Sequence, residues 1–333
     1  MLDTSRVEAR FAIEAVCKAA ELARRINASA TLMRITKKDL SPVTVADFAA
    51  QTVVARLLSE TLPDDALVAE ESSDSLRVPG AVETVDTVTS FVATVLNGAT
   101  SGDVCAWIDR GGADPGERFW ALDPLDGTKG YLRGGQYAVA LALVERGVVR
   151  LGVLGCPNLD EECQPGLQGP GALVVAVRGE GAWYRSMMED GDFRSLRVSA
   201  VSNPAEARVF RSHEAGHTNV DQIQELTRAL GVRADPVLMD SQAKYAVMAA
   251  GGGELLFRLL SPEAPGYRER IWDQAAGSII IEEAGGRITD LDGKPLDFTQ
   301  GRELQCNRGI VASNGVLHDQ ALEAVARVIK RGR

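Results

Sequence analysis

Apolar side chains recur at helical spacing near the start of the chain and predict two amphipathic helices. Over residues 7–26 they return every three or four positions, with Phe11, Leu22 and Ile26 on roughly one face. A second helix is predicted over residues 47–62, and Pro63 ends it because proline lacks the N–H that a helix interior needs. The same spacing predicts further helices over residues 81–96, 219–230, 241–250, 272–284 and 316–331.

Shorter apolar runs lie between the helical segments and predict strands. Residues 66–69 form one such run, which leads directly into Glu70 and Glu71. The segments RFWALD, YAVALALVERG and VVRLGVLGC follow, and the turn at Gly147 between the last two predicts a hairpin. The glycine-rich segment over residues 102–118 is expected to be a surface loop. Further strands are predicted over residues 172–177, 255–259 and 309–312.

Alternation of strands and helices is typical of layered α/β and α+β folds. A chain of 333 residues is too long for one simple core and fits two packed domains of ~100–200 residues each. The stretch over residues 156–171 is rich in Pro and Gly, so we place the predicted boundary there. We therefore expect an N-terminal α+β domain over residues 1–157 and a C-terminal α/β domain over residues 158–333.

The overall charge disfavours two classes of partner. A formal net charge of −10 and a pI near 5.0 would repel both nucleic acid and an acidic membrane surface. The five cysteines contain no C-x-x-C pair, which favours reduced thiols over a disulfide framework or a zinc site. No apolar run approaches the ~20 residues of a membrane-spanning helix, and the first residues do not resemble a signal peptide. We expect a cytoplasmic protein, either a monomer or a small homo-oligomer.

Four segments place carboxylates directly after apolar residues. Asp47 follows SPVTVA, Glu70 follows ALVA, Asp123 and Asp126 lie in LDPLDGT, and Asp273 lies in IWDQAAG. Each acid alone has an ordinary explanation, since the first turn of a helix favours negative charge and a surface acid is well solvated. If the acids converged in an apolar setting, they would need hard divalent cations as countercharge. Their convergence is the hypothesis on which a catalytic function depends.

The segment Asp-Pro-Leu-Asp-Gly-Thr suits such a site. The rigid Pro124 lets Asp123 and Asp126 point toward one place, and the Leu125 carbonyl between them is a further oxygen ligand. Gly127 and Thr128 then open a turn whose backbone N–H groups can hold a phosphate. Two or three metal ions beside such a turn are typical of phosphoryl-group hydrolysis.

The segments SPVTVAD, EE, WALDPLDGTKGYLRG and IWDQAAG resemble the lithium-sensitive, magnesium-dependent phosphatase superfamily of inositol monophosphatases and fructose bisphosphatases. Within it, DGTKGYLRGGQYAVALAL, GVLGCPNL and MDSQAKYAVMAAG are similar to the 3′(2′),5′-bisphosphate nucleotidases of the salt-tolerance type. The similarity extends over residues 7–329. It implies a layered α-β-α-β-α sandwich with two subdomains, the first binding metal and the second binding substrate, together with inhibition by Li⁺ and a role in sulfur assimilation.

The resemblance also implies two or three Mg²⁺ ions in each active site. Asp123 would bind both the first and the second ion. Glu70 would share the first ion with it, and Asp126 would share the second. A third, weaker ion would lie near Glu70, with Asp47 holding its waters. The implied metal ligands are Glu70, Asp123, Leu125 through its carbonyl, Asp126 and Asp273.

For catalysis, the resemblance implies that Asp47 and Thr128 orient and deprotonate the attacking water, with Glu70 as a further catalytic residue. The implied reaction removes the 3′-phosphate from 3′-phosphoadenosine 5′-phosphate and gives AMP and phosphate. The implied substrate contacts are Gly127, Thr128, His217, Ser241, Lys244 and Arg258. His213 is an alternative to His217 as the histidine that contacts the substrate.

Three alternatives stay open at this point. The sulfate-bearing precursor of that nucleotide could be a substrate as well. The same metal core also suits an inositol-phosphate or sugar-phosphate phosphatase. A sensor of nucleotide or metal that keeps the fold without turnover is a different class of function.

Overall fold

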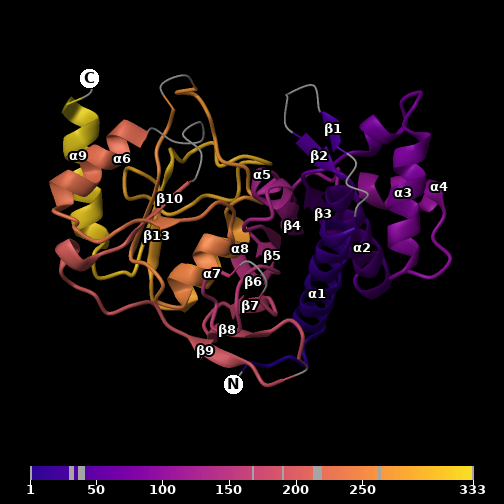
Figure 1. The fold of residues 1–333 in the computed structure, drawn as a ribbon, viewed down its shortest axis with the longest axis horizontal. Coiled ribbons are helices and arrows are strands. Elements are labelled where there is room, and N and C mark those ends of the chain that lie inside the picture. Colours follow the sequence, from indigo (N-terminus) through magenta and orange to yellow (C-terminus); the bar gives the residue numbers. More distant parts are fainter. Residues whose placement is uncertain are drawn as a thin grey trace.

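A computed structural model describes residues 2–29, 34–36, 42–166, 169–189, 191–212, 220–261 and 264–331. Five layers are stacked side by side in the order helices, sheet, helices, sheet, helices (Figure 1). The outer helices α6 (Val220–Leu230) and α9 (His318–Arg331) lie at one edge of the view, and the helices of the N-terminal part lie at the other. The predicted α-β-α-β-α sandwich is therefore confirmed.

The first layer is made of helices from the N-terminal part of the chain. These are α1 (Val7–Ala28), α2 (Val45–Thr61), α3 (Val82–Ala93) and α4 (Ser101–Asp109). Helices α1 and α2 pack on one face of the larger sheet, where the Phe11 ring meets Trp120 edge-on at 5.0 Å between centroids. The two helices predicted first from the apolar spacing thus bury the face that the spacing indicated.

The prediction of a surface loop over residues 102–118 was wrong for its first half, because α4 lies there. Thr100 and Asp103 form a reciprocal capping box, in which each side chain accepts from the other residue's backbone N–H. Val104 and Ile108, four residues apart, are both buried against α2 and α3. The glycines favoured a loop in the prediction, whereas the capping box and the buried apolar side chains favour the helix α4.

The larger sheet has seven strands in the order β3-β4-β5-β6-β7-β8-β9. Only β3 and β4 are parallel within it, and each later strand pairs antiparallel with its predecessor. The predicted hairpin at Gly147 joins β5 to β6. The strands are β3 (Ala66–Ala69), β4 (Arg118–Asp126), β5 (Ala138–Glu145), β6 (Val148–Cys156), β7 (Ala172–Val177), β8 (Gly181–Ser186) and β9 (Arg194–Leu196).

The middle layer consists of α7 (Ala243–Ala249) and α8 (Ala275–Glu283), with the short α5 (Thr128–Leu132) at the end of β4. Helix α8 lies very close to the larger sheet at Gly152. A Cβ there would come within 2.5 Å of Ile279 and 2.9 Å of a backbone oxygen of α8. Only glycine allows this approach, and it brings the residues that precede α8 up to the end of β4.

The smaller sheet has five strands in the order β11-β10-β12-β14-β13. Its outer face is covered by α6 and α9 through the apolar cluster that includes Ile223, Phe257 and Val325. The remaining elements are β1 (Arg34–Thr36), β2 (Pro42–Thr44), η1 (Ser73–Leu76), η2 (Pro204–Glu206), β10 (Val209–Arg211), β11 (Val237–Leu238), β12 (Leu255–Arg258), β13 (Arg287–Thr289) and β14 (Ile310–Ser313).

The larger sheet runs across the position of the predicted domain boundary. Strand β6 ends at Cys156, and it pairs with β7, which begins at Ala172. The two large sheets divide only after β9. The boundary between residues 157 and 158 stays a prediction. In the described part of the chain, no helix combines the length and the apolar character needed to cross a lipid bilayer.

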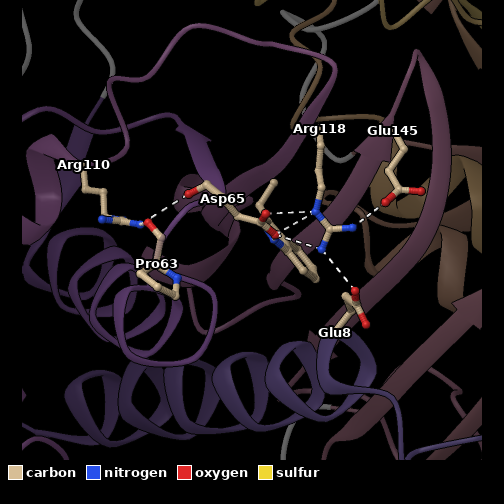
Figure 2. A network of polar contacts seen from close by, with 7 residues as sticks. Glu8, Pro63, Asp65, Arg110, Arg118 and Glu145 are labelled. Atoms are coloured by element: carbon tan, nitrogen blue, oxygen red, sulfur yellow. Dashed lines mark hydrogen bonds and ion pairs between the residues drawn. The ribbon is translucent and has the colours of Figure 1, made fainter.

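A cluster of charged side chains, here called the Arg118 cluster, joins α1, β4 and β5 at the start of β4 (Figure 2). The guanidinium of Arg118 donates to both carboxylate oxygens of Asp65, from Nε to Oδ1 at 2.9 Å and from a terminal nitrogen to Oδ2 at 3.0 Å. It also pairs with Glu8 at 3.1 Å and with Glu145. The indole N–H of Trp120 donates to Asp65 as well, at 2.9 Å. Hydrogen bonding and charge from Asp65 raise the pKa of Arg118, so the arginine stays protonated.

Candidate active site

One cavity of about 290 Å³ lies where β3, β4, β12 and the starts of α2 and α7 meet. It collects the residues singled out in the sequence, although they come from six separate segments of the chain. His217 and its alternative His213 lie outside the described residues. The sequence-predicted residues that line the cavity are Asp47, Glu70, Asp123, Leu125, Asp126, Gly127, Thr128, Ser241, Lys244, Arg258 and Asp273.

A bulge in β4 brings two of the acids to the same cavity. In a regular strand, residues three apart face opposite sides of the sheet. Asp123 pairs with Ala140 and Asp126 pairs with Ala138, so β4 has one residue more than β5 between these two pairs. The extra residue at Pro124–Leu125 turns both carboxylates toward the cavity. The Asp123 carboxylate accepts the Leu125 N–H at 3.0 Å, which holds the bulge in shape.

The acids of the cavity repel one another. Burial raises the pKa of Asp123 well above its usual range, and the charges of Glu70, Asp126, Asp273 and Asp47 raise it further. Burial likewise raises the pKa of Asp273 and of Asp126. A set of carboxylates that disfavour one another's charge this strongly is stabilised when a cation lies between them.

The chemistry of the donor set fits a hard divalent cation. The lining offers carboxylate oxygens and a carbonyl oxygen, without cysteine or histidine among the described residues, which is the ligand preference of Mg²⁺. Among the described residues, no three His, Cys, Asp or Glu side chains form a group that could hold a metal ion as they stand. The carboxylates line one cavity instead.

The cavity lining also carries cations, among them Lys244 and Arg258. Burial lowers the pKa of Lys244 to about 8, and the charge of Arg258 lowers it too, while Asp126 opposes the shift. Arg258 is held by a two-point contact with the buried Glu269, from Nε to Oε1 at 3.1 Å and from a terminal nitrogen to Oε2 at 2.9 Å. Glu269 had no signal in the sequence, because nothing local distinguishes it from a solvated acid.

Ser241 lies at a tight contact between β4 and the start of α7. Its φ of +67° is in the left-handed region, which serine rarely adopts. A Cβ on Gly127 would come within 2.7 Å of the Ser241 Cβ, so only glycine fits at Gly127. The next backbone N–H, that of Gln242, donates to the Asp126 carboxylate. The loop before α7 is therefore fixed directly against the acid that the sequence predicted as a ligand.

Several lining residues were missed by the sequence analysis. Asp240 could have been found, because it precedes Ser241 directly, and it pairs with Arg133 at 2.9 Å. The others lie in α5 (Lys129), in α6 (Ile223) and in the strands and connections of the smaller sheet, and they carry no local signal. They include Lys129, Phe210, Arg211, Ser212, Ile223, Met239, Leu256, Phe257 and Tyr267.

Known proteins are similar to this chain in sequence and in fold. The profile of the inositol monophosphatase family matches residues 4–330. A 3′(2′),5′-bisphosphate nucleotidase of Oryza sativa is 42% identical over 313 residues, which are 89% of this chain and 86% of that protein. The protein of the same name from Schizosaccharomyces pombe is 37% identical over 343 residues, covering 97% of this chain and 96% of its own.

Among solved structures, the IMPase of Thermotoga maritima superposes with a TM-score of 0.66 at 22% identity, over 97% of this chain and 98% of that one. CysQ of Bacteroides thetaiotaomicron superposes with a TM-score of 0.61 at 21% identity, over 92% of this chain and 97% of its own. These two likenesses concern the fold. Members of the matched family are metal-dependent phosphatases that typically use Mg²⁺. From its sequence over nearly its whole length, the chain belongs to the inositol monophosphatase family.

Proposed function

We propose that this protein is a Mg²⁺-dependent 3′(2′),5′-bisphosphate nucleotidase that converts 3′-phosphoadenosine 5′-phosphate to AMP and inorganic phosphate. The observation that carries the proposal is one cavity lined both by the acids and by the cations Lys244 and Arg258. A substrate with two phosphates needs both kinds of group, one for the reacting phosphate and one for the other. Relatives at 36–42% identity are named 3′(2′),5′-bisphosphate nucleotidases, which supports the same substrate class.

The acids have the roles of metal ligands in this proposal. Glu70, Asp123 and the Leu125 carbonyl would hold one Mg²⁺. Asp123, Asp126 and Asp273 would hold a second, and a third would lie near Glu70. When bound, Mg²⁺ stabilises negative charge on the phosphoryl oxygens and lowers the pKa of water toward neutrality.

Asp47 and Thr128 would activate the attacking water. Asp47 lies in the first turn of α2, and Thr128 begins α5 and donates from Oγ1 to the Leu125 carbonyl at 3.3 Å. With its proton committed to that carbonyl, the Thr128 hydroxyl oxygen can accept from water, while Asp47 takes the other proton. The water oxygen then bonds to phosphorus, the bond from phosphorus to the 3′ oxygen breaks, and that oxygen takes up a proton from solvent while Asp47 releases its proton to solvent.

Lys244 and Arg258 would bind the 5′-phosphate. Glu269 occupies one edge of the Arg258 guanidinium, which fixes the orientation of its other N–H groups. Ser241, Gly127 and the histidine at position 217 are the further proposed contacts. The substrate is a small molecule. It stays a prediction that the protein binds neither nucleic acid nor membranes, that it is cytoplasmic, and that it is a monomer or a small homo-oligomer.

A substrate panel tests the assignment. Phosphate release is measured at saturating Mg²⁺ with 3′-phosphoadenosine 5′-phosphate, its sulfate-bearing precursor, inositol phosphates and fructose 1,6-bisphosphate. We expect the bisphosphate nucleotide to have the highest kcat/KM, and Li⁺ to inhibit at limiting Mg²⁺. A preference for an inositol or sugar phosphate would favour the rival phosphatase. Absence of phosphate release from every compound would favour the sensor.

A further inference from the structure

The backbone on either side of Glu70 is held by side chains from distant elements. Ala69 precedes Glu70 as the last residue of β3, and Glu71 follows it. Both neighbours are buried, while Glu70 itself reaches into the cavity. The position of the Glu70 carboxylate therefore depends on what fixes residues 69 and 71.

Gln51 fixes Glu71 to α2. Its side-chain oxygen accepts the Glu71 N–H at 3.0 Å, and its Nε2 donates to the Glu71 carbonyl at 2.8 Å. The other Nε2 hydrogen goes to the Ile108 carbonyl at 2.9 Å, and Gln51 is fully buried. Gln51 lies four residues after Asp47 on α2, so both side chains share one face of that helix. The same helix thus carries one cavity acid and holds the backbone of another.

Arg302 fixes Ala69 to the segment that carries Asp273. One terminal nitrogen donates to the Ala69 carbonyl, and the other donates to the Ala113 carbonyl at 3.1 Å. The guanidinium lies 4.9 Å from the ring centroid of Trp272, a distance at which it is attracted to the face of the ring. Trp272 is the residue before Asp273, so one arginine contacts the residues preceding two cavity acids that are about 200 positions apart in the sequence.

Gly111 allows both contacts at once. A Cβ at this position would come within 2.6 Å of the Gln51 Nε2 and within 2.7 Å of the Ala69 Cβ. Its carbonyl also accepts the Ala69 N–H at 2.8 Å. The close packing of α2, β3 and the segment after α4 therefore leaves these polar side chains little freedom to move.

We propose that Gln51 and Arg302 are positioning residues that hold the Glu70 carboxylate at a set place relative to Asp47 and Asp273. The inference rests on the proposed Mg²⁺ site and deepens it. Residues that orient metal ligands without touching the ion typically change metal affinity by about 10- to 100-fold. Loss of either side chain should weaken Mg²⁺ binding by about tenfold or more through Glu70.

The test compares Arg302→Met and Gln51→Met with the parent protein. Two quantities are titrated with Mg²⁺: the melting temperature without substrate, and phosphate release. We expect the Mg²⁺ concentration for half-saturation to rise about tenfold in both titrations, with most of kcat recovered at saturating Mg²⁺. The conservative Arg302→Lys keeps the charge and can reach only one carbonyl, so an intermediate shift is expected. It also replaces Arg302→Met should that variant fail to fold.

Arg270→Met is the matched control. Arg270 lies over the same Trp272 ring at 5.9 Å and pairs with Glu303 at the surface. Its half-saturating Mg²⁺ concentration should stay within about twofold of the parent value, since it leaves Ala69 held. A lower melting temperature for the Gln51 and Arg302 variants with unchanged Mg²⁺ half-saturation would mean a purely structural role and overturn the inference.

The substrate-free titration separates this inference from the proposed function. If the parent is stabilised by Mg²⁺ but prefers another phosphate ester, the nucleotide assignment fails. The positioning roles are then still decided by the Mg²⁺ half-saturation of the Gln51 and Arg302 variants. If the parent shows no Mg²⁺ stabilisation at all, the proposed metal site and the positioning roles both fail.

Discussion

The charged side chains at the two ends of β4 lie in opposite environments. At its start, Arg118 meets carboxylates from three other parts of the chain, and hydrogen bonds satisfy most of them (Figure 2). At its end, Asp123 meets the charges of further acids, and burial raises the pKa of both Asp123 and Asp126. The apolar residues between the two ends pair in the same regular way with β5.

Solvent exposure explains why the difference matters. The Arg118 side chain is 33% exposed, so water still solvates part of its charge and the pairs are formed at little cost. Asp123 is 2% exposed and has no such solvation. The first end stabilises the fold, whereas the buried acids at the second destabilise it, and a bound cation would offset their repulsion. Each of the following changes tests one side of this comparison.

Asp123→Asn should have the largest effect. It removes the proposed bridging ligand and also one of the mutually repelling charges, so activity and stability should move in opposite directions. We expect kcat to fall about 10³-fold or more, since metal stabilisation of the transition state is worth several kcal/mol. The metal-free melting temperature should be at least that of the parent. Near-normal turnover, measured by phosphate release at saturating Mg²⁺, would contradict the ligand role.

Lys244→Ala tests one of the cations that line the same cavity. We expect KM for the bisphosphate nucleotide to rise roughly 10- to 100-fold, because one charge-assisted hydrogen bond to phosphate is lost, with little change for a monophosphate. The pKa of Lys244 is lowered to about 8, so the parent KM should also rise as the pH passes about 8 and the amine loses its proton. The exposed Lys294→Ala is the control. Equal losses on both substrates would argue against a role at the second phosphate.

Arg118→Met breaks the paired end. It leaves Asp65, whose side chain is 12% exposed, with Trp120 as its remaining partner in the cluster. We expect the free energy of unfolding to fall by about 1–3 kcal/mol in urea titrations, with normal turnover per folded molecule. Arg327→Met, which removes an exposed ion pair with Glu323 on α9, should change stability by less than about 0.5 kcal/mol. A loss of activity at full folding would contradict the separation of the two ends.

His318 extends the comparison to a buried side chain that stays uncharged at neutral pH. Its ring nitrogens contact the hydroxyls of Thr289 at 3.0 Å and Ser313 at 2.9 Å. Burial lowers its pKa to about 4, and Arg287 lowers it further against the opposing charge of Asp319. As the pH falls, His318 takes up a proton in the unfolded chain before it does so in the folded protein. Its contribution to the free energy of unfolding is therefore complete above about pH 6.5 and is lost as the pH falls toward 4. Urea titrations at pH 7.5 and 5 should show a smaller pH effect in His318→Asn than in the parent, by about 2 kcal/mol.

The sequence predicted much of this, and its failures have physical causes. Asp123 and Asp126 were predicted together because proline between two acids after an apolar strand is a local pattern. The helix α4 was missed because the glycines near it outweighed its capping box. Glu269 and Arg302 were invisible, since the contacts of Glu269 with Arg258 and of Arg302 with Ala69 join parts of the chain that no local pattern relates.

The sequence by itself determined the chemistry: which segments become helices and strands, and which oxygen and nitrogen donors follow them. Only the tertiary structure decided that these donors share one cavity. Residues 47, 70, 123 and 273 meet because two sheets and three helical layers bury their apolar faces together, and that burial is cooperative over the whole chain. The side chains that hold the backbone beside Glu70 belong to the same category, because their partners exist only once the layers have packed.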